Sequence, residues 1–503
     1  MTKPIKDSQK PQREPRWWSK YWFYTVLISL AMIGVPSAFF VPPIIPGLTN
    51  DGNTVVSVRQ GILAVLAGAL TMLTLSETHR KNTHEKDKND RDHTRQVYAE
   101  RRSRYTKAVE QLANEKAAVR LGGIYTLVGL VDEWLADESL TKDKQKEEGQ
   151  VIINNLCSYI RSPFPLAEKI DEYEARKELE KLQKSESEKL SEEESSQLQV
   201  LLKRFKDSDE YEKPKDVTAD YAKFYEEQDV RRTIFVEMSK RSSISFTEGR
   251  KVIKTVLGVW SDFDFDFTRA PIFYPLSNLT IEKGNFSSAK FYTNADFRWV
   301  VFTQNANFQR TSFANNADFS GATFIQTANF RESTITGTAN FPWVTIIGTA
   351  YFRWATFIKN ANFSEATITR SSDFREVTFA QNANFSGVFF SKKAYFSGAV
   401  FTQNANFSSA VFNAGSPRFV ITSGGPEATI RAQFAALAKN QEAHNFTVSE
   451  GSFRIPPGEA ELGDGVKHHI PVGTILFDPS SGETSEPAKP LDKSNDGEED
   501  KSE

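Results

Sequence analysis

Few residues in this sequence have a type and spacing that could carry out catalysis or hold a metal. Cys157 is the only cysteine among 503 residues, so a disulfide framework and a thiolate metal cluster are excluded. His468 and His469 are adjacent but lack further Cys or His ligands at the spacing of a zinc site. The alternating carboxylates of Asp262–Phe267 would lie about 6.8 Å apart on a strand and need other ligands to bind a cation. No phosphate-binding glycine loop or nucleophile elbow is present, so we predict no catalytic, cofactor or metal site and no enzyme.

Three arginines at a spacing of 22 residues offer a different chemistry, the binding of an anionic partner. If one structural repeat has 22 residues, then Arg331, Arg353 and Arg375 stack in a single column. Glu332 and Glu376 fall in the adjacent column. We favour the interpretation that these carboxylates neutralise the arginines on a solvated face.

Two tryptophans form the sharper candidate for a partner site. Trp299 and Trp343 are 44 residues apart, with Gly321 midway between them, on the side opposite the arginine column. Exposed aromatic side chains are costly unless they are used, so these two predict a protein-binding surface. A corner that is packed under a loop is the alternative explanation.

The element that must position these side chains is a regular repeat. Phenylalanine recurs every 11 residues in one series, which we call the first. A second series of Phe or Ile follows each of its members five residues later, and a small residue stands two positions before each member of the first series. The region 284–412 contains 22 of the 39 phenylalanines and no leucine, so one structural slot is used repeatedly. The first series has twelve members spaced by 11 residues: Phe286, Phe297, Phe308, Phe319, Phe330, Phe341, Phe352, Phe363, Phe374, Phe385, Phe396 and Phe407.

Neither a coiled coil nor a long flat strand accounts for this pattern. On a helix, positions five apart differ by about 140°, so the two series could not share one stripe. In a flat strand, an odd step sends successive phenylalanines to opposite faces. A solenoid of short sides remains, in which each side points one large and one small residue inward and the rings stack along the axis.

Units such as Ala306–Arg310, Ala317–Gly321 and Ala405–Ser409 resemble those of the pentapeptide repeat proteins. The resemblance implies a right-handed quadrilateral β-helix of about six coils, or roughly 29 Å, with a spacing that alternates between five and six residues. Helical pieces within 104–161 resemble a segment that precedes the repeats in membrane-anchored bacterial members.

The best known members of that family protect DNA gyrase by presenting an acidic rod that imitates DNA. Region 284–412 has ten Lys or Arg and six Asp or Glu, a net charge of +4. A rod of that sign does not imitate a phosphate backbone, so we disfavour a gyrase-protecting function and expect no nucleic-acid partner.

The amino-terminal part predicts a membrane anchor. Tyr21–Val41 is apolar and of spanning length, Pro36 is a candidate kink, and Val55–Leu75 is a weaker second span that contains Arg59. A cleaved signal peptide is disfavoured, because the apolar core is long and Pro42 lies where small cleavage-site residues are expected. Six Lys or Arg precede the first span and nine lie in His79–Arg104. The positive-inside rule therefore predicts a multi-pass cell-membrane protein with both termini in the cytoplasm.

The remaining segments predict an α+β chain of several domains. After a basic N-terminus (1–20) and the hairpin (21–77), a helical module covers 84–245 and includes a charged insertion (166–222) with helices at Ile170–Lys184 and Glu192–Lys206. The β-helix with its N-terminal cap covers 261–419. A cap helix at Glu427–Lys439 and a small β element fill 420–478, and a disordered acidic tail covers 479–503.

These expectations favour a membrane-anchored, non-enzymatic protein that offers a rigid cytosolic surface to an unidentified protein. The alternative is a signalling or regulatory protein whose hairpin passes the state of the bilayer to the cytosolic helices. Self-association into a homo-oligomer is left open.

Overall fold

The computed structural model describes residues 17–44, 52–184, 198–199, 201–202, 205, 216–248, 251–422, 429–437, 443–463 and 465–491. The chain divides into two compact units, residues 1–103 and 104–503. The first unit holds the expected membrane hairpin, and the second holds the helical module and the repeat.

Two helical segments occupy the expected spans of the first unit. The first consists of α1 (Trp17–Ser29), the π-helical turn η1 (Leu30–Gly34) and α2 (Val35–Phe40), and the 3-10 turn η2 (Pro42–Ile44) follows it. The second is α3 (Gly52–Leu112), which continues well past the expected end of the span at Leu75. By length and composition, both segments contain a stretch that could cross a membrane.

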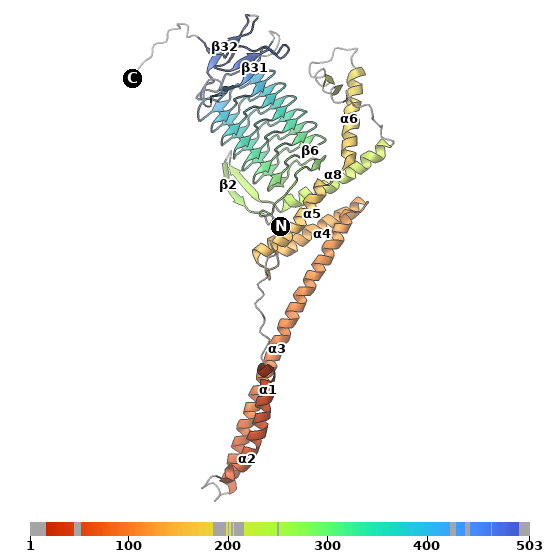
Figure 1. Ribbon diagram of the computed structural model, residues 1–503, viewed down its shortest axis with the longest axis vertical. Coiled ribbons are helices and arrows are strands. Elements are labelled where there is room, and N and C mark those ends of the chain that lie inside the picture. The colour runs from red at the N-terminus through yellow and green to blue at the C-terminus, as the bar shows by residue number, and fades with distance from the viewer. Residues whose placement is uncertain are drawn as a thin grey trace, which may run out of the picture. The chain divides into compact units, whose positions relative to one another are not determined.

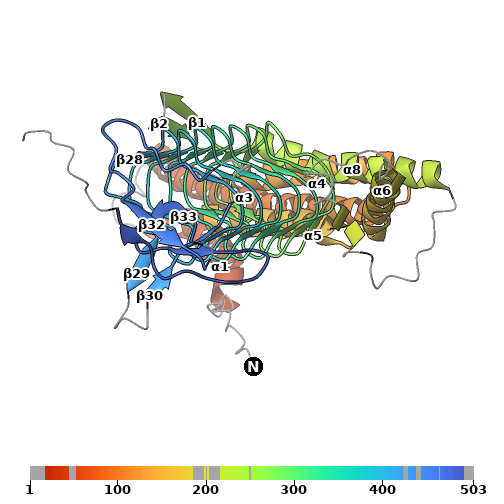
Figure 2. The same ribbon diagram turned by 90° about the horizontal axis from the view of Figure 1, so that it is seen from above.

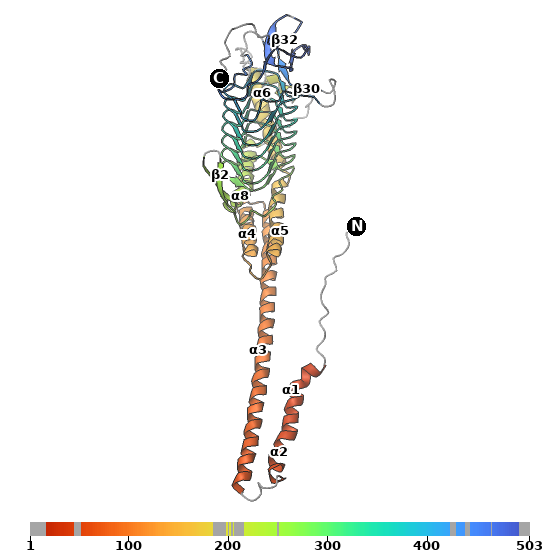
Figure 3. The ribbon, with the colours of Figure 1, turned by 90° about the vertical axis from the view of Figure 1, so that its left-hand side faces the viewer.

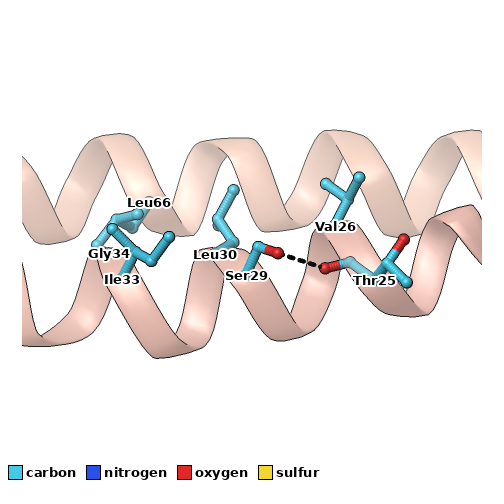
Figure 4. Close-up of a pocket in the computed structure, with 7 residues that line it drawn as sticks. All are labelled: Thr25, Val26, Ser29, Leu30, Ile33, Gly34 and Leu66. Atoms are coloured by element: carbon cyan, nitrogen blue, oxygen red, sulfur yellow. Dashed lines mark hydrogen bonds between the residues drawn. The ribbon is translucent and has the colours of Figure 1, made fainter.

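The π-helical turn lies directly before Pro36. Proline has no N–H and its ring disturbs the preceding turn, so the helix rearranges its hydrogen bonds there. A groove beside this turn is lined by residues that include Thr25, Ser29, Gly34 and Leu66 (Figure 4). A Cβ on Gly34 would lie 2.5 Å from a δ carbon of Leu66, so this glycine lets the two helices approach closely.

The helical module contains α4 (Ala117–Leu135), α5 (Lys142–Arg161), α6 (Pro165–Lys184) and α8 (Val217–Lys240). Asp216 caps α8 by accepting the backbone N–H of Ala219 at 2.9 Å. The buried guanidinium of Arg231 in α8 donates to Glu227 at 2.7 Å and to the carbonyl of Ile160 at the end of α5 at 2.9 Å. This paired charge ties the two helices together.

The first helix of the charged insertion is present as α6, which begins earlier than expected. The second expected helix, Glu192–Lys206, lies mostly outside the described residues. Its described positions include Leu198 and Leu201, which are buried against Leu182 of α6.

Four parallel sheets of mostly two-residue strands form a solenoid, and each full coil takes one strand from each sheet (Figure 1). Ala317 pairs with Ala339 and Phe313 with Ile335, so one coil has 22 residues. Figure 2 shows the coils obliquely from above, with α6 on one side and β1 (Ile244–Glu248) and β2 (Lys251–Val256) away from it.

The sheets are numbered as faces in the order in which the chain visits them from β7. The first face has β7 (Ala295–Asp296), β11 (Ala317–Asp318), β15 (Ala339–Asn340), β19 (Ala361–Asn362), β23 (Ala383–Asn384) and β27 (Ala405–Asn406). The second has β4 (Thr280–Ile281), β8 (Val301–Phe302), β12 (Thr323–Phe324), β16 (Thr345–Ile346), β20 (Thr367–Ile368), β24 (Phe389–Phe390) and β28 (Val411–Phe412). The third has β5 (Gly284–Asn285), β9 (Ala306–Asn307), β13 (Ala328–Asn329), β17 (Ala350–Tyr351), β21 (Ser372–Asp373) and β25 (Ala394–Tyr395). The fourth has β3 (Pro271–Ile272), β6 (Lys290–Phe291), β10 (Ser312–Phe313), β14 (Thr334–Ile335), β18 (Thr356–Phe357), β22 (Thr378–Phe379), β26 (Val400–Phe401), β31 (Gln433–Ala435) and β34 (Ile475–Phe477).

The core of the solenoid is the predicted phenylalanine ladder. All twelve members of the first series are buried. Rings one coil apart stack nearly parallel, as Phe341 and Phe363 do at 4.8 Å and 6°. Rings half a coil apart meet edge to face, as Phe374 and Phe385 do at 5.4 Å. The two geometries fill the interior without a gap between coils.

Helix α8 closes the N-terminal end of the ladder. Phe235 of α8 packs on Phe267 at 4.6 Å and on Phe286 at 6.2 Å. Phe263, Phe265 and Phe267 are buried, but their segment is not the strand on which the carboxylates of Asp262–Phe267 were expected. A single bridge joins Asp266 to Asn285, because the chain is still entering the first coil there.

The C-terminal end differs from the prediction. In place of the expected cap helix at Glu427–Lys439, β29 (Val420–Thr422) and β30 (Thr429–Arg431) form a hairpin, and β31 joins the fourth face. Phe434 of β31 stacks on Phe401 at 4.8 Å. The ladder thus continues past Phe412 in an irregular further coil, and this burial outweighs the helical pattern of the sequence.

Beyond that coil, β32 (Pro457–Glu461), β33 (Lys467–Pro471) and β35 (Lys489–Pro490) form a small sheet at the end of the solenoid remote from α8 (Figure 3). This sheet is the small β element expected within 420–478. The disordered tail was predicted to begin at residue 479, but β35 at Lys489–Pro490 forms part of this sheet. The rest of that tail, 492–503, lies outside the described residues.

Candidate interaction surface on the solenoid corners

Two corners of each coil are turned by a residue in the left-handed conformation. This residue stands two positions after each phenylalanine of the first series, with φ between 55° and 75°. Glycine adopts this conformation readily. For other residues the left-handed conformation costs roughly 1–2 kcal/mol of conformational free energy. The corner between the first and second faces has Trp299, Gly321, Trp343, Glu365, Gly387 and Ser409, and we call it the tryptophan corner. The corner between the third and fourth faces has Ser288, Arg310, Glu332, Trp354, Glu376 and Gly398, and we call it the arginine corner.

The tryptophan corner presents its two indoles to solvent. Trp299 is 59% exposed and Trp343 is 61% exposed, so the explanation of a corner packed under a loop does not apply. A Cβ on Gly321 would lie 2.3 Å from two ring carbons of Trp299, so that indole lies directly on the glycine backbone. Trp299 and Trp343 lie two coils apart along one corner. Gly321 lies between them, and the indole of Trp299 packs on its backbone.

Carboxylates surround this corner. Asp296 accepts two hydrogen bonds from the guanidinium of Arg298, the shorter at 2.7 Å, and Asp318 lies 4.0 Å from the same guanidinium. Glu365 occupies the corner position one coil beyond Trp343 and is exposed. The local charge around the indoles is acidic, in contrast to the net positive charge of the whole repeat.

At the arginine corner, the three predicted arginines lie in one column beside carboxylates, but of the two expected partners only Glu376 pairs with the column, because Glu332 pairs with Arg310 at 2.7 Å. Arg353 lies 2.6 Å from Glu376, and Arg375 lies 2.7 Å from Asp373. The hydrogen bond to Asp373 raises the pKa of Arg375. Arg331 lies over the ring of Tyr351 at 4.2 Å and is 4.0 Å from Asp373. The arrangement favours a solvated, internally paired face over a binding site for an anion.

Trp354 is a surface aromatic that the sequence analysis did not single out. It is 45% exposed, lies under the guanidinium of Arg353 at 3.9 Å, and donates its Nε1–H to Glu376 at 2.9 Å. It occupies the same slot as Trp343 one unit later, so the 11-residue period could have revealed it. Its indole is engaged within the arginine corner.

The other two corners carry parts of the chain itself. At the corner between the fourth and first faces, Tyr292 donates to Glu168 of α6 at 2.7 Å, and this hydrogen bond lowers the pKa of Glu168. At the corner between the second and third faces, Gln304 donates to the carbonyl of Ser261 at 3.0 Å. Near it, Glu282 accepts the N–H of Ser243, which precedes β1.

An apolar patch on the β1–β2 hairpin also escaped the sequence analysis. Ile244, Phe246, Leu257 and Val259 are between 49% and 74% exposed. The alternation of apolar and polar residues in 244–256 is the signal that could have identified the hairpin.

The residues considered as metal ligands do not converge. His468 and His469 are successive residues of β33, so their side chains leave the sheet on opposite faces. Within the described ranges, no group of three or more His, Cys, Asp or Glu side chains lies close enough together to hold an ion. Cys157 is buried in α5, and burial raises the pKa of its thiol to about 12.

Comparison with known proteins agrees with this geometry. Residues 300–343 match the family model described as pentapeptide repeats (9 copies), and this segment ends at Trp343 and begins one residue after Trp299. No curated protein and no solved structure matches the chain. The matched segment lies inside the four-sided solenoid, and its units carry the inward phenylalanine and alanine of that family. The solenoid of this chain is therefore built of pentapeptide repeats.

Proposed function

We propose that this protein is a membrane-tethered, non-enzymatic scaffold whose solenoid offers a rigid cytosolic surface to a protein partner. The observation that carries the proposal is the tryptophan corner. Two large apolar side chains are exposed there, in a backbone conformation that favours glycine. Both features cost stability, so their presence supports a use in binding.

The corner is suited to binding because its backbone is already ordered. The N–H of Trp299 donates to the carbonyl of Ser320 at 3.1 Å, and that of Trp343 donates to Ser364 at 3.0 Å. The phenylalanine ladder lies directly beneath both. A partner would therefore not have to order this backbone on binding, which leaves more of the interaction energy for affinity.

Replacement of both indoles tests the surface. We expect the Trp299→Ala/Trp343→Ala protein to lose a specific partner when the full-length chain is isolated from native membranes. Buried aromatic anchors typically contribute about 2 kcal/mol or more each, so affinity should fall at least several hundredfold. Trp354→Ala is the matched control, because it removes an exposed indole from the same slot at the other corner.

The fold should survive the double substitution, because neither residue belongs to the ladder, and an unchanged melting temperature would check this. Arg353→Glu identifies a nonspecific basic attraction, which would appear mainly as a change in salt sensitivity. If the double variant keeps its full set of partners, the solenoid is a passive spacer and the proposed surface is wrong.

The anchor and its orientation need a separate experiment. The two apolar helical segments and the basic residues beside them support a hairpin with both ends in the cytoplasm. Cys157 is too buried to report on this, because its thiol would be unreactive on either side of the membrane. In intact cells, a membrane-impermeant thiol reagent should label Thr49→Cys and should label Lys392→Cys only after permeabilisation. The reverse pattern would overturn the orientation.

A further inference from the structure

We propose that the tryptophan corner binds a proline-rich peptide in the polyproline II conformation, with prolines three residues apart and a Lys or Arg two positions from one of them. This inference rests on the proposed function of the corner as a docking surface and names the chemistry of its partner. Three observations support it: the spacing of the indoles, their free hydrogen-bond donors and the charge beside them.

The spacing of the indoles matches the pitch of polyproline II. Trp299 and Trp343 occupy the same position in coils that are two apart. Neighbouring strands lie about 4.8 Å apart, so the two positions are separated by about 9.6 Å. Polyproline II rises about 3.1 Å per residue with three residues per turn, which gives about 9.3 Å between prolines of a Pro-x-x-Pro segment. Two prolines on one side of the peptide would therefore meet the two indoles together.

The indoles also have the chemistry that such a peptide requires. Pyrrolidine rings pack on flat aromatic surfaces, and the backbone of polyproline II has no internal hydrogen bonds, so its carbonyls seek donors. Among the described residues, no hydrogen bond occupies the Nε1–H of Trp299 or of Trp343. The Nε1–H of Trp354, by contrast, is already donated to Glu376. The tryptophan corner therefore has exposed indole faces and unoccupied Nε1–H donors, whereas the indole donor of the arginine corner is already used.

Charge decides what else the peptide must contain. Glu365 follows Trp343 by one coil, about 4.8 Å further along the corner. Its carboxylate lies over Gly387, where a Cβ would be 2.3 Å from Oε1. A cationic side chain two residues beyond the second proline would reach this carboxylate, because two residues of polyproline II advance about 6.2 Å. Glu365 therefore selects a peptide with Lys or Arg at that place.

The same charge argues against the other ligand that stacks on exposed aromatics. Single-stranded nucleic acid also uses tryptophan platforms, but it requires a positive groove for its phosphates. Asp296, Asp318 and Glu365 flank the indoles, and Arg298 is paired with Asp296. Phosphates would be repelled along this corner.

Fluorescence anisotropy with the full-length protein in nanodiscs tests the inference. The probes are labelled Pro-Ala-Ala-Pro-Ala-Lys and its reverse, Lys-Ala-Pro-Ala-Ala-Pro, since a polyproline II helix can be read in either direction. We expect one of them to bind, and Trp299→Ala or Trp343→Ala to weaken binding by at least about tenfold. Glu365→Gln should weaken binding and reduce its salt dependence. Trp354→Ala should leave the affinity unchanged.

Two further probes define failure. A peptide with one extra alanine between the prolines should bind at least about tenfold more weakly, because its prolines are about 12.4 Å apart. Equal binding of this peptide, no binding of either probe, or tryptophan-dependent binding of oligothymidine would overturn the inference. If the peptides fail while the double tryptophan variant still loses its native partner, the proposed function stands and only the polyproline assignment is wrong.

Discussion

Each phenylalanine of the ladder is fixed by neighbours from two directions. Phe352 stacks between Phe330 at 5.0 Å and Phe374 at 4.8 Å, and it meets Phe341 and Phe363 edge to face. Replacing one ring therefore disturbs four contacts at once. This crowding explains why the 11-residue period holds without a gap in the sequence.

Substitutions at an inward and an outward position should therefore differ sharply. Phe352→Asp places an unpaired charge among aromatic rings, and we expect a loss of several kcal/mol in the free energy of unfolding. Ser364, one residue past Phe363, is half-buried and lies outside the ladder, and its replacement by Asp should cost no more than about 0.5 kcal/mol. Denaturant unfolding of the two full-length variants checks this. Equal losses would contradict the assignment of inward and outward sides.

At the same scale, residue type predicted burial but not backbone conformation. The inward positions could be predicted because the ladder demands one large residue per side. The left-handed corners could not, because Trp299, Arg310 and Glu332 stand where the conformation would favour glycine. The solenoid imposes this conformation, and no local signal announces it.

At the scale of elements, the two ends of the solenoid are closed by different means. Helix α8 covers one end with Phe235, whereas an irregular coil with β31 and β34 continues the other. His444 is buried in that coil. It accepts the N–H of Ala405 at Nδ1, and its Nε2 lies 3.0 Å from the carbonyl of Ala435, so the proton is on Nε2.

Acid should loosen this coil before the rest of the solenoid. Burial lowers the pKa of His444 from 6.5 to about 4, so the unfolded coil takes up a proton that the folded coil excludes. The contribution of the neutral imidazole is complete above pH 6.5 and is lost as the pH falls from 6.5 towards 4, by roughly 3 kcal/mol in all. The hydrogen-exchange protection factors of the Phe434 and Leu476 amides should fall over that range relative to those of the ladder.

His444→Gln is the control for this acid effect, because an amide does not titrate. The variant is expected to show weaker protection at neutral pH but no additional loss between pH 6.5 and 4. If exchange in the wild-type coil is the same at pH 7 and pH 4.5 relative to the ladder, His444 does not govern the opening of the coil.

The ends were also where prediction from sequence was least successful. The segment Glu427–Lys439 has helical spacing and an N-terminal proline, yet the structure has strands there, because Phe434 adds one more ring to the ladder. An irregular coil interrupts the period, so a search for spacings of 11 stops at Phe407. Regular coils are thus predictable from sequence, whereas closures depend on tertiary contacts.

At the scale of the whole molecule, charge and hydropathy distinguish the expected membrane anchor from the solenoid. The apolar segments and basic flanks of the first unit predict an anchor, and ion pairs engage Arg353 and Arg375 at the arginine corner of the solenoid. The tryptophan corner differs, because its two indoles are exposed. Its use depends on three-dimensional spacing, which only the stacked coils provide.

The direction of the hydrogen bonds has a mechanical consequence. Bonds such as Phe308 N–H to the carbonyl of Asn329 join each coil to the next and run along the solenoid, so a pull on its two ends loads them in series. Such a structure yields from an end, one coil after another. Each coil of 22 residues then releases about 75 Å of chain. The solenoid would therefore behave as an extensible tether that lengthens in steps under tension and does not fail in a single event.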